Sequence, residues 1–586
     1  MSLKISVRAI AGAAVAAAAV SVAGFQATPP AAAKLVLAPC DIEGLQTKAR
    51  CGTYQVWENR DAKAGRRIPL KVVVVPATGE READAFTYFA GGPGEAATRL
   101  APFLATEFAA FRVHHDLLLV DQRGTGGSHA LDCDLYPGTD AQAALGAFYP
   151  PDRVRACRTV LEKDADLRFY TTPIAVDDLD EVREALGYAR LNLFGGSYGT
   201  RAALVYIRRH EDHVRSAVLQ GVQPATDAIP LRFPKFAQQA IDAIFADCAA
   251  DAACHTAFPS LPAELRAIVD RASKAPVPVD ILDPKTGDPI HVSLTRDLLG
   301  EALRYLMYQS ATGLLVPSLV HQASEGDFGA LAEFALFSRR QLVNGLGQGL
   351  YLSVTCSEDL PFIEAAEAER EASNTFLGDY RYRQQRAACE QWVRGPIPAD
   401  YRQPTKSNVP VLMLSGAWDP VTPPSNAQAG AATLPRAALI TVPSGGHDYD
   451  GLEGVECVGE LVGRFLNNGS ADGLDKSCVN RIRRPPFPTT AMPTRPVTLT
   501  PDQLAAFNGR YVTAGAPDLQ IRATNGKLSA KLGDEDAMVL VPVTPTRLRV
   551  LGAVGSYLDV EMENGRPSRM TLDRTGVKSL TWKREQ

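Results

Sequence analysis

The chain has 586 residues, which is too long for one compact core. Of these residues 46% are hydrophobic and 22% are charged, which is the composition of a folded protein. We therefore expect two or three domains. Its 61 Lys and Arg residues against 66 Asp and Glu residues give a formal net charge of -5. Because binding nucleic acid requires a basic surface that neutralises phosphates, nucleic-acid partners are not expected.

The first residues have the pattern of an export signal. Lys4 and Arg8 carry positive charge, an alanine-rich apolar run covers 9–25, and small residues around Ala23 suit a signal peptidase. We assign 1–27 to a signal peptide, which predicts a secreted or periplasmic protein with no membrane span once the signal is removed. A retained membrane anchor is the alternative, although the run is shorter than the ~20 residues that a bilayer requires.

Ten cysteines, all beyond the signal region, agree with export, because an even number of cysteines in an exported chain indicates disulfides. No C-x-x-C motif is present, so the sequence does not predict a zinc or redox site. Sequential pairing closes short local loops, and we expect bonds 40–51, 133–157, 248–254, 356–389 and 457–478.

Strand and helix patterns alternate along much of the chain. Apolar residues at helical spacing predict helices at 176–186 and 200–209. This alternation predicts a mostly parallel sheet covered on both faces. Apolar, β-branched runs predict strands at 68–76, 85–90, 117–120, 191–194, 217–219, 409–414 and 438–442.

The alternation breaks over 224–407, which is helix-rich and irregular. We expect this segment to be an inserted, mainly helical cap over the carboxyl edge of the sheet, where ligands bind in open α/β sheets. The sheet core then comprises 40–223 and 408–482. A proline-rich linker is predicted at 483–497, and short alternating runs over 498–586 predict a small all-β domain.

The segment 195–199 reads Gly-Gly-Ser-Tyr-Gly and lies between a predicted strand and a predicted helix. In that context G-x-S-x-G is a nucleophile elbow, a tight turn that lifts the serine hydroxyl above the sheet and frees the next backbone N–H for an oxyanion. Small residues are needed because the turn is strained and closely approached. The bare pattern has many chance matches, so the flanking elements carry the prediction that Ser197 is a nucleophile.

A serine hydroxyl needs a base to take its proton, and in this fold the chain order is serine, acid, histidine. Asp419 follows the sixth predicted strand, and His447 follows the seventh and is the only histidine after Asp419. We predict that His447 is the base and that Asp419 orients it. Asp448 and Asp450 are alternatives, although adjacency along the chain does not produce the required hydrogen bond.

The second oxyanion donor is expected from a loop after an early sheet strand. The turn Gly91–Gly94 follows the strand predicted at 85–90, and its glycines leave backbone N–H groups unobstructed. We assign the N–H groups of Gly92 and Tyr198 to the oxyanion hole, with Gly91 in reserve. A tight turn without a catalytic role is the alternative.

Five motifs occur in a specific order: AGGPG, DQRGTGGS, GGSYGTR, GAWDPVTP and GGH. Together they resemble the prolyl and tripeptidyl aminopeptidase family of α/β-hydrolases, over roughly Cys40 to Cys478. The resemblance implies a secreted exopeptidase that removes residues or tripeptides from free N-termini. It also gives Ser197, Asp419 and His447 the positions of the catalytic triad.

Two departures from the family flank the oxyanion loop and affect the proline specificity that the resemblance would imply. Prolyl aminopeptidases usually have His where this chain has Ala90, and often have Gly at the position of Glu95. The C-terminal β domain is similar to lipocalin-like domains that follow some bacterial serine hydrolases.

An aminopeptidase must recognise an ammonium group, which requires carboxylates in a confined site. Glu358 and Asp359, next to Cys356, resemble an acidic cap segment of the family and are the candidates. A solvated acidic turn is the alternative. Asp121 and Arg123 also follow a predicted strand, and we interpret them as stabilising a glycine-rich turn.

The sequence therefore predicts an α/β-hydrolase with a mostly parallel sheet, an inserted helical cap and a small C-terminal all-β domain. Its predicted activity is that of a serine aminopeptidase of the prolyl or tripeptidyl type, acting through an acyl-enzyme on peptides with a free N-terminus. This chemistry requires no cofactor and no metal. A carboxylesterase or lipase-like hydrolase with the same triad is the main alternative, and a non-catalytic binding protein of the same fold is another.

Overall fold

The computed structural model describes residues 35–136, 140–493, 495–514, 516–533, 536–575 and 579–585. The predicted signal peptide, 1–27, lies outside the described residues. Among the helices of the described part of the chain, none is both long and apolar enough to cross a membrane.

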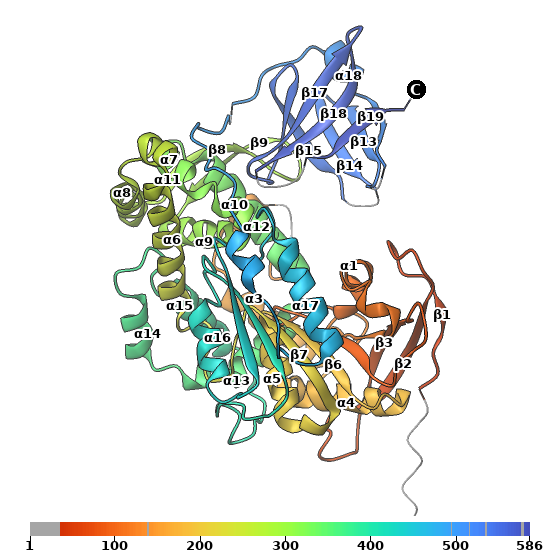
Figure 1. The fold of residues 1–586 in the computed structure, drawn as a ribbon. Helices are drawn as coiled ribbons and strands as arrows, with labels where there is room; N and C mark the ends of the chain where they lie inside the picture. Colours follow the sequence, from red (N-terminus) through yellow and green to blue (C-terminus); the bar gives the residue numbers. More distant parts are fainter. Residues whose placement is uncertain are drawn as a thin grey trace, which may run out of the picture. The chain divides into compact units, whose positions relative to one another are not determined.

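The first part of the structure is built on a nine-stranded, mostly parallel sheet, formed by β1 to β7, β10 and β11 (Figure 1). The strand pairings from β5 to β11 are parallel, whereas β1, β2 and β3 form antiparallel pairs at one edge. The mostly parallel sheet was predicted; its antiparallel edge, with β1 and β2, was not. In spatial order the strands are β1 (Ala38–Cys40), β2 (Ala49–Trp57), β3 (Arg67–Val75), β5 (Asp116–Val120), β4 (Ala85–Phe89), β6 (Leu191–Gly196), β7 (Val214–Gln220), β10 (Val411–Gly416) and β11 (Ala437–Val442).

Both faces of the central strands are buried, which explains the apolar runs in β4, β5, β6 and β10. Val72 and Val74 of β3 belong to one hydrophobic cluster, whereas Val73 and Val75 belong to the cluster on the opposite face. Successive side chains of a strand point to opposite faces, so a strand covered on both faces needs an unbroken apolar run.

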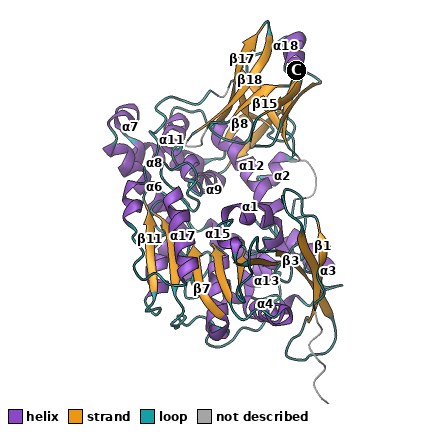
Figure 2. Ribbon diagram, turned by 45° about the vertical axis from the view of Figure 1, so that its right-hand side comes forward, coloured by secondary structure: helices purple, strands orange, loops and turns teal. Residues whose placement is uncertain are grey.

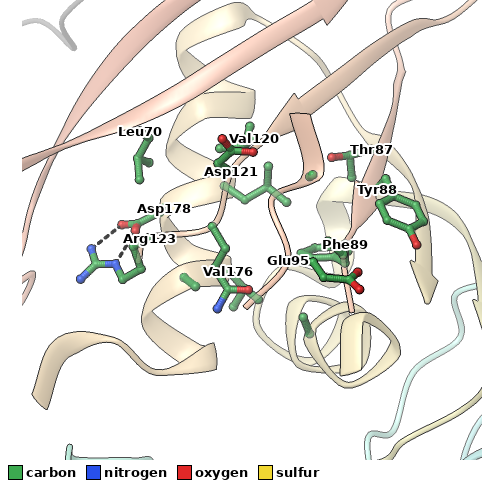
Figure 3. Close-up of a pocket in the computed structure, with 16 residues that line it drawn as sticks. Leu70, Thr87, Tyr88, Phe89, Glu95, Val120, Asp121, Arg123, Val176 and Asp178 are labelled. Atoms are coloured by element: carbon green, nitrogen blue, oxygen red, sulfur yellow. Dashed lines mark hydrogen bonds and ion pairs between the residues drawn. The ribbon is translucent and has the colours of Figure 1, made fainter. Parts of the chain in front are cut away.

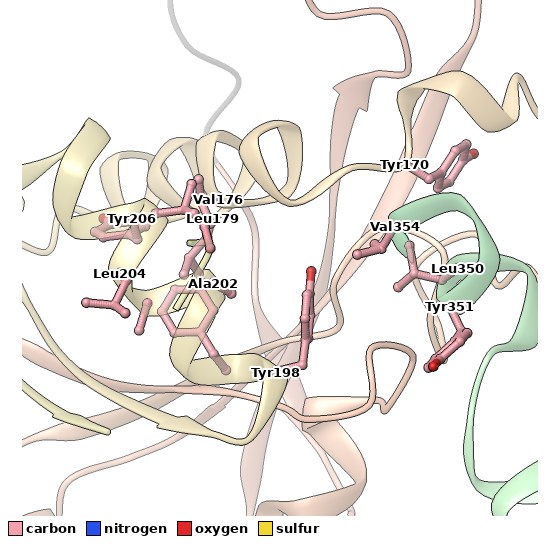
Figure 4. Packing of buried hydrophobic residues seen from close by; sticks show 14 of the residues in the cluster. Tyr170, Val176, Leu179, Tyr198, Ala202, Leu204, Tyr206, Leu350, Tyr351 and Val354 are labelled. Atoms are coloured by element: carbon pink, nitrogen blue, oxygen red, sulfur yellow. The ribbon is translucent and has the colours of Figure 1, made fainter. Parts of the chain in front are cut away.

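Helices pack on both faces of the sheet (Figure 2). Side chains of α4 (Thr172–Leu186), α5 (Tyr198–Arg209) and α13 (Gln348–Glu358) join one cluster, which Figure 4 shows from close by. Side chains of α1 (Ala101–Glu107) and α17 (Glu456–Asn468) join the other. The remaining helices of the sheet region are η1 (Ala97–Leu100), η2 (Phe111–Val113), α2 (Ala141–Ala144), α3 (Pro151–Leu161), η3 (Leu167–Phe169), η4 (Glu211–His213), α16 (Pro424–Ala431) and η6 (Ser477–Arg481).

The chain between β7 and β10 is mainly helical, with one hairpin that the sequence did not predict. Most of its helices pack around a cluster of their own, which Trp418 of the loop after β10 also joins. Helices α13 and α15 instead join the sheet cluster, so the insert shares a core with the sheet. The other elements are α6 (Phe233–Ala250), α7 (Ala252–Ala257), α8 (Leu261–Lys274), β8 (Val277–Leu282), β9 (Pro289–Leu294), α9 (Arg296–Leu306), α10 (Ser310–Gly313), α11 (Val316–Ser324), α12 (Gly329–Gly345), η5 (Leu360–Phe362), α14 (Ala365–Ala372) and α15 (Tyr380–Cys389).

The predicted all-β domain is a closed barrel filled by apolar side chains, including those of Tyr511, Leu548 and Trp582. Closure leaves no unpaired strand edge. One buried ion pair joins the barrel to the insert: Arg549 Nη1 lies 2.9 Å from Glu333 Oε1. The elements are α18 (Pro501–Ala506), β12 (Gly509–Val512), β13 (Leu519–Thr524), β14 (Lys527–Leu532), β15 (Met538–Thr544), β16 (Arg547–Val550), β17 (Ser556–Glu563), β18 (Arg566–Arg574) and β19 (Thr581–Arg584).

The disulfides follow the predicted sequential pairing. The first joins β1 to β2, and the fourth joins α13 to α15, which fixes the segment that carries Glu358. The bonds are Cys40–Cys51, Cys133–Cys157, Cys248–Cys254, Cys356–Cys389 and Cys457–Cys478.

Candidate active site

Ser197 occupies the sharp turn between β6 and α5. Its backbone has φ 56° and ψ −123°, a strained conformation for a residue with a side chain. The turn is held by a 2.9 Å hydrogen bond from the Ser197 N–H to the Gln220 carbonyl. A Cβ at Gly199 would collide with the carbonyl oxygens of Phe89 and Ala90, so glycine is required there. Ser197 itself stays partly accessible to solvent.

Asp419 and His447 follow the neighbouring parallel strands β10 and β11, which brings them together at one edge of the sheet. His447 Nδ1 lies 2.8 Å from Asp419 Oδ2. Asp419 is 2% exposed and accepts further hydrogen bonds from the N–H groups of Val421 and Thr422 and from the Thr422 hydroxyl. These donors fix the carboxylate while it orients the imidazole.

The imidazole of His447 lies beside the turn that carries Ser197. A Cβ placed on Gly221 would be 2.8 Å from His447 Cε1, and Gly221 directly follows Gln220, the acceptor of the Ser197 N–H. In the described structure no hydrogen bond joins Ser197 Oγ to His447. Such bonds are often long in a free enzyme and shorten in the substrate complex.

The insert holds the loop that carries His447, a contact that was not predicted from the sequence. The Gly446 N–H donates to Ser310 Oγ at 2.9 Å, and the Asp448 N–H donates to the Tyr308 carbonyl at 2.7 Å. The ring of Tyr308 meets the His447 ring edge to face, with centroids 5.2 Å apart. The segment from Tyr308 to Ser310 therefore helps to position the imidazole.

The charges around His447 favour its protonated form. Burial by itself lowers the pKa of His447, but the charge and hydrogen bond of Asp419, together with the charges of Asp448 and Glu95, raise it to about 9. Burial opposes ionisation of Asp419, yet the imidazole and the donors at Thr422 hold its pKa below the ordinary value. The pair is therefore arranged to stabilise an imidazolium.

The loop after β4 lies over the turn of Ser197. A Cβ on Gly91 would be 3.4 Å from the Gly196 carbonyl oxygen and 3.5 Å from Ser197 Cβ. The Gly91 N–H is taken up by Glu95 Oε2 at 3.0 Å. The predicted oxyanion donors belong to these two segments: Gly92 lies in the loop, and Tyr198 is the first residue of α5, where a backbone N–H has no acceptor within the helix.

A small cavity of about 30 Å³ lies behind this loop, at the ends of β3, β4 and β5 (Figure 3). It has room for about one water molecule and is too small for a substrate. Asp121, in its wall, accepts hydrogen bonds from the N–H groups of Thr98 and Gly127, and Arg123 pairs with Asp178 at 2.6 Å. Asp121 and Arg123 thus hold the turn together, as we interpreted them from the sequence.

Glu358 and Asp359 lie at the end of α13 and are both 0% exposed, so the solvated acidic turn is wrong. Glu358 accepts hydrogen bonds from the N–H and hydroxyl of Thr172 and from the Tyr401 hydroxyl. Asp359 pairs with the buried Arg201 at 2.9 Å. Because partners within the protein occupy these oxygens, the structure does not present the two carboxylates to a substrate beside His447.

A group with metal-binding side chains lies away from this site. Ligand atoms of Asp180, His210 and His213 lie within 4.8 Å of one another. Arg183 donates to Asp180 Oδ1 at 2.7 Å and lies 3.1 Å from His213 Nδ1, so a guanidinium already supplies the positive charge there.

Two family models match the chain, on either side of the insert's middle part. The model for the α/β hydrolase fold matches residues 88–266, and the model for TAP-like protein matches residues 374–478. The first segment contains Ser197, and the second contains Asp419 and His447.

Similar proteins include peptidases and an esterase. The chain is 26% identical over 491 residues to serine protease Hip1 of Mycobacterium tuberculosis, a match that covers 75% of this chain and 90% of that protein. It is 30% identical over 199 residues to tripeptidyl aminopeptidase of Streptomyces coelicolor, covering 31% and 36%. It is also 30% identical over 223 residues to carboxylesterase B of Mycobacterium tuberculosis, covering 35% and 43%.

Proposed function

We propose that this chain, an α/β-hydrolase with the TAP-like segment of the family whose motifs it carries, is a serine exopeptidase that releases N-terminal residues or tripeptides. The observation that carries the proposal is the 2.8 Å hydrogen bond between His447 Nδ1 and Asp419 Oδ2, formed beside the turn of Ser197. The similarity to a serine protease and a tripeptidyl aminopeptidase supports peptides as the substrates.

In the proposed reaction the Ser197 hydroxyl attacks the scissile carbonyl while His447 takes its proton. The N–H groups of Gly92 and Tyr198 stabilise the oxyanion, and Asp419 stabilises the imidazolium. The C–N bond then breaks, and the leaving amine takes the proton from His447. Water, deprotonated by the same imidazole, hydrolyses the ester on Ser197 and releases the N-terminal product.

The insert supports an exopeptidase rather than an enzyme that cleaves within folded chains. Leu346, between α12 and α13, lies 3.0 Å from the position of a Cβ on Gly92, so the insert reaches the oxyanion loop. On the other side it holds the loop of His447. A site enclosed from two sides suits a short peptide or a free chain end.

We further propose that the enzyme acts outside the cytoplasm. Its five disulfides suit an oxidising compartment, and the segment 1–27 has the composition of an export signal.

The test is a panel of aminoacyl and tripeptidyl 4-nitroanilides, each with a free and an N-acetylated amino group. We expect hydrolysis of the free-amine substrates and its loss on acetylation. Ser197→Ala should lower kcat by a factor on the order of 10⁶. Ser373→Ala, on the exposed end of α14, is the matched control and should keep wild-type kinetics.

The second candidate is a carboxylesterase, which the similarity to carboxylesterase B favours. The same triad would serve it, since only the acyl group differs. Fast hydrolysis of 4-nitrophenyl esters, with arylamide hydrolysis absent or indifferent to acetylation, would establish the esterase and end the exopeptidase proposal. Labelling of Ser197 by a fluorophosphonate separates both enzymes from a non-catalytic binding protein.

A further inference from the structure

Glu95 is an accessible carboxylate fixed to the oxyanion loop. Its side chain is exposed to solvent, although protein surrounds it on most sides. Oε2 accepts the Gly91 N–H at 3.0 Å, and the Glu95 N–H in turn faces the Gly91 carbonyl at 3.4 Å. The first contact holds the carboxylate against the oxyanion loop, and the second closes the turn between Gly91 and Glu95.

The charge of His447 acts on this carboxylate, but no ion pair joins the two side chains in the described structure. None of the described Lys, Arg and His side chains forms an ion pair with Glu95, or with Asp448, the exposed acid next to His447. Burial raises the pKa of Glu95, as does the charge of Asp448, against the hydrogen bond from Gly91 and the charge of His447. An exposed carboxylate beside the nucleophile, with no ion-pair partner among the described residues, is suited to a cationic group of the substrate.

The other acids predicted for this role already have partners within the protein. Asp359 has the guanidinium of Arg201, and Glu358 has the hydroxyls of Tyr401 and Thr172. The N-terminal ammonium of a peptide would have to displace those partners from a fully buried position, whereas the side chain of Glu95 is exposed.

The distance from Glu95 to the nucleophile sets the length of the acyl group. One point, the position of a Cβ on Gly91, lies 3.2 Å from Glu95 Oε2 and 3.5 Å from Ser197 Cβ. Glu95 Oε2 and Ser197 Cβ are therefore separated by at most the sum of these two distances. In a single residue the ammonium nitrogen lies about 2.5 Å from the carbonyl carbon, and each further extended residue adds about 3.3–3.6 Å. The nitrogen-to-carbon distance of a single residue fits between Glu95 and Ser197, whereas that of an extended tripeptide is longer than the gap.

We propose that Glu95 binds the α-ammonium group of the residue that is transferred to Ser197, so that the enzyme releases single N-terminal residues rather than tripeptides. The inference rests on the proposed exopeptidase function and names its substrate contact.

Glu95→Gln tests the role of the charge, because the glutamine amide keeps an oxygen for the Gly91 N–H and so preserves the loop. The readout is kcat/KM on an aminoacyl 4-nitroanilide divided by kcat/KM on 4-nitrophenyl acetate, which has no ammonium group. We expect this ratio to fall by about 10- to 100-fold, mainly through KM. Glu95→Asp should restore part of it, and Glu364→Gln, an exposed control on the insert, should leave it at the wild-type value.

The outcomes separate the inference from the function on which it rests. An unchanged ratio in Glu95→Gln, while the wild type cleaves only free-amine substrates, removes Glu95 from amine binding and leaves the exopeptidase standing. A wild type that prefers tripeptidyl over aminoacyl 4-nitroanilides overturns the proposal that the enzyme releases single residues. A wild type indifferent to acetylation overturns both proposals.

Discussion

Replacing Asp419 by Asn removes the charge behind His447 with the least change in shape. Asp419 is buried and holds four donors: the N–H groups of Val421 and Thr422, the Thr422 hydroxyl and, at 2.8 Å, His447 Nδ1. Asn keeps one acceptor oxygen for the backbone donors. Its NH₂ group would meet the Nδ1–H of His447, so the imidazole must adopt the other tautomer and present a proton to Ser197.

We expect Asp419→Asn to lower both kcat and the pKa of His447. The wrong tautomer cannot accept the serine proton, so kcat should fall by about 10⁴-fold, or about 5.5 kcal/mol of barrier. The pKa of His447, about 9 in the wild type, should fall towards its ordinary value of 6.5 because burial then acts without the carboxylate. The difference corresponds to roughly 3 kcal/mol less stabilisation of the imidazolium.

Only the neutral imidazole acts as a base, so kcat/KM should rise with pH as His447 loses its proton. In the wild type this limb should lie above neutrality, and in Asp419→Asn it should lie at lower pH. The assay is kcat/KM on an arylamide from about pH 5 to about pH 10, with thermal melting as the check on folding and Asp450→Asn as the control. A variant within tenfold of wild-type kcat, or one with an unmoved limb, would refute this account of Asp419.

Two further substitutions separate the roles of the acids. Asp448→Asn should move the same pH limb to lower pH while kcat stays within about tenfold, because Asp448 raises the pKa of His447 by its charge alone; an unchanged limb would contradict this. Asp359→Asn leaves Arg201 buried without its partner and should lower the free energy of unfolding by about 3–5 kcal/mol in a urea titration. Wild-type stability with a raised KM for free-amine substrates would instead return Asp359 to amine binding.

The sequence predicted those parts of the fold that depend on local signals. The continuous apolar run at β3 and the small residues around Ser197 report burial and close backbone approach directly, so the parallel sheet and the turn of the nucleophile could be recognised. The strands β1 and β2 and the hairpin β8–β9 were missed. β1 and β2 lie mostly at exposed or half-buried positions, so pairing with a neighbouring strand, rather than composition, makes them strands.

The contacts of the acids could not be predicted because their partners are distant in the chain. Glu358 meets Thr172, which is 186 residues earlier, and Asp359 meets Arg201, which is 158 residues earlier. A sequence motif shows that a carboxylate is present and does not show whether the fold supplies a donor for it. Glu95 is the opposite case, since its position next to the oxyanion loop was evident and the missing counter-ion was not.

The unpaired acids connect substrate selection to the state of the base. With no ligand, the charges of Glu95 and Asp448 help to keep His447 protonated, which is the wrong state for accepting the serine proton. An ammonium group on Glu95 would cancel one of these charges and lower the pKa of His447 in the complex. Binding the correct end of a peptide would then favour the neutral imidazole, whereas an N-acetylated peptide, which brings no charge, would not. The same contact would thus select the substrate and prepare the base, at the cost of a less active free enzyme at neutral pH.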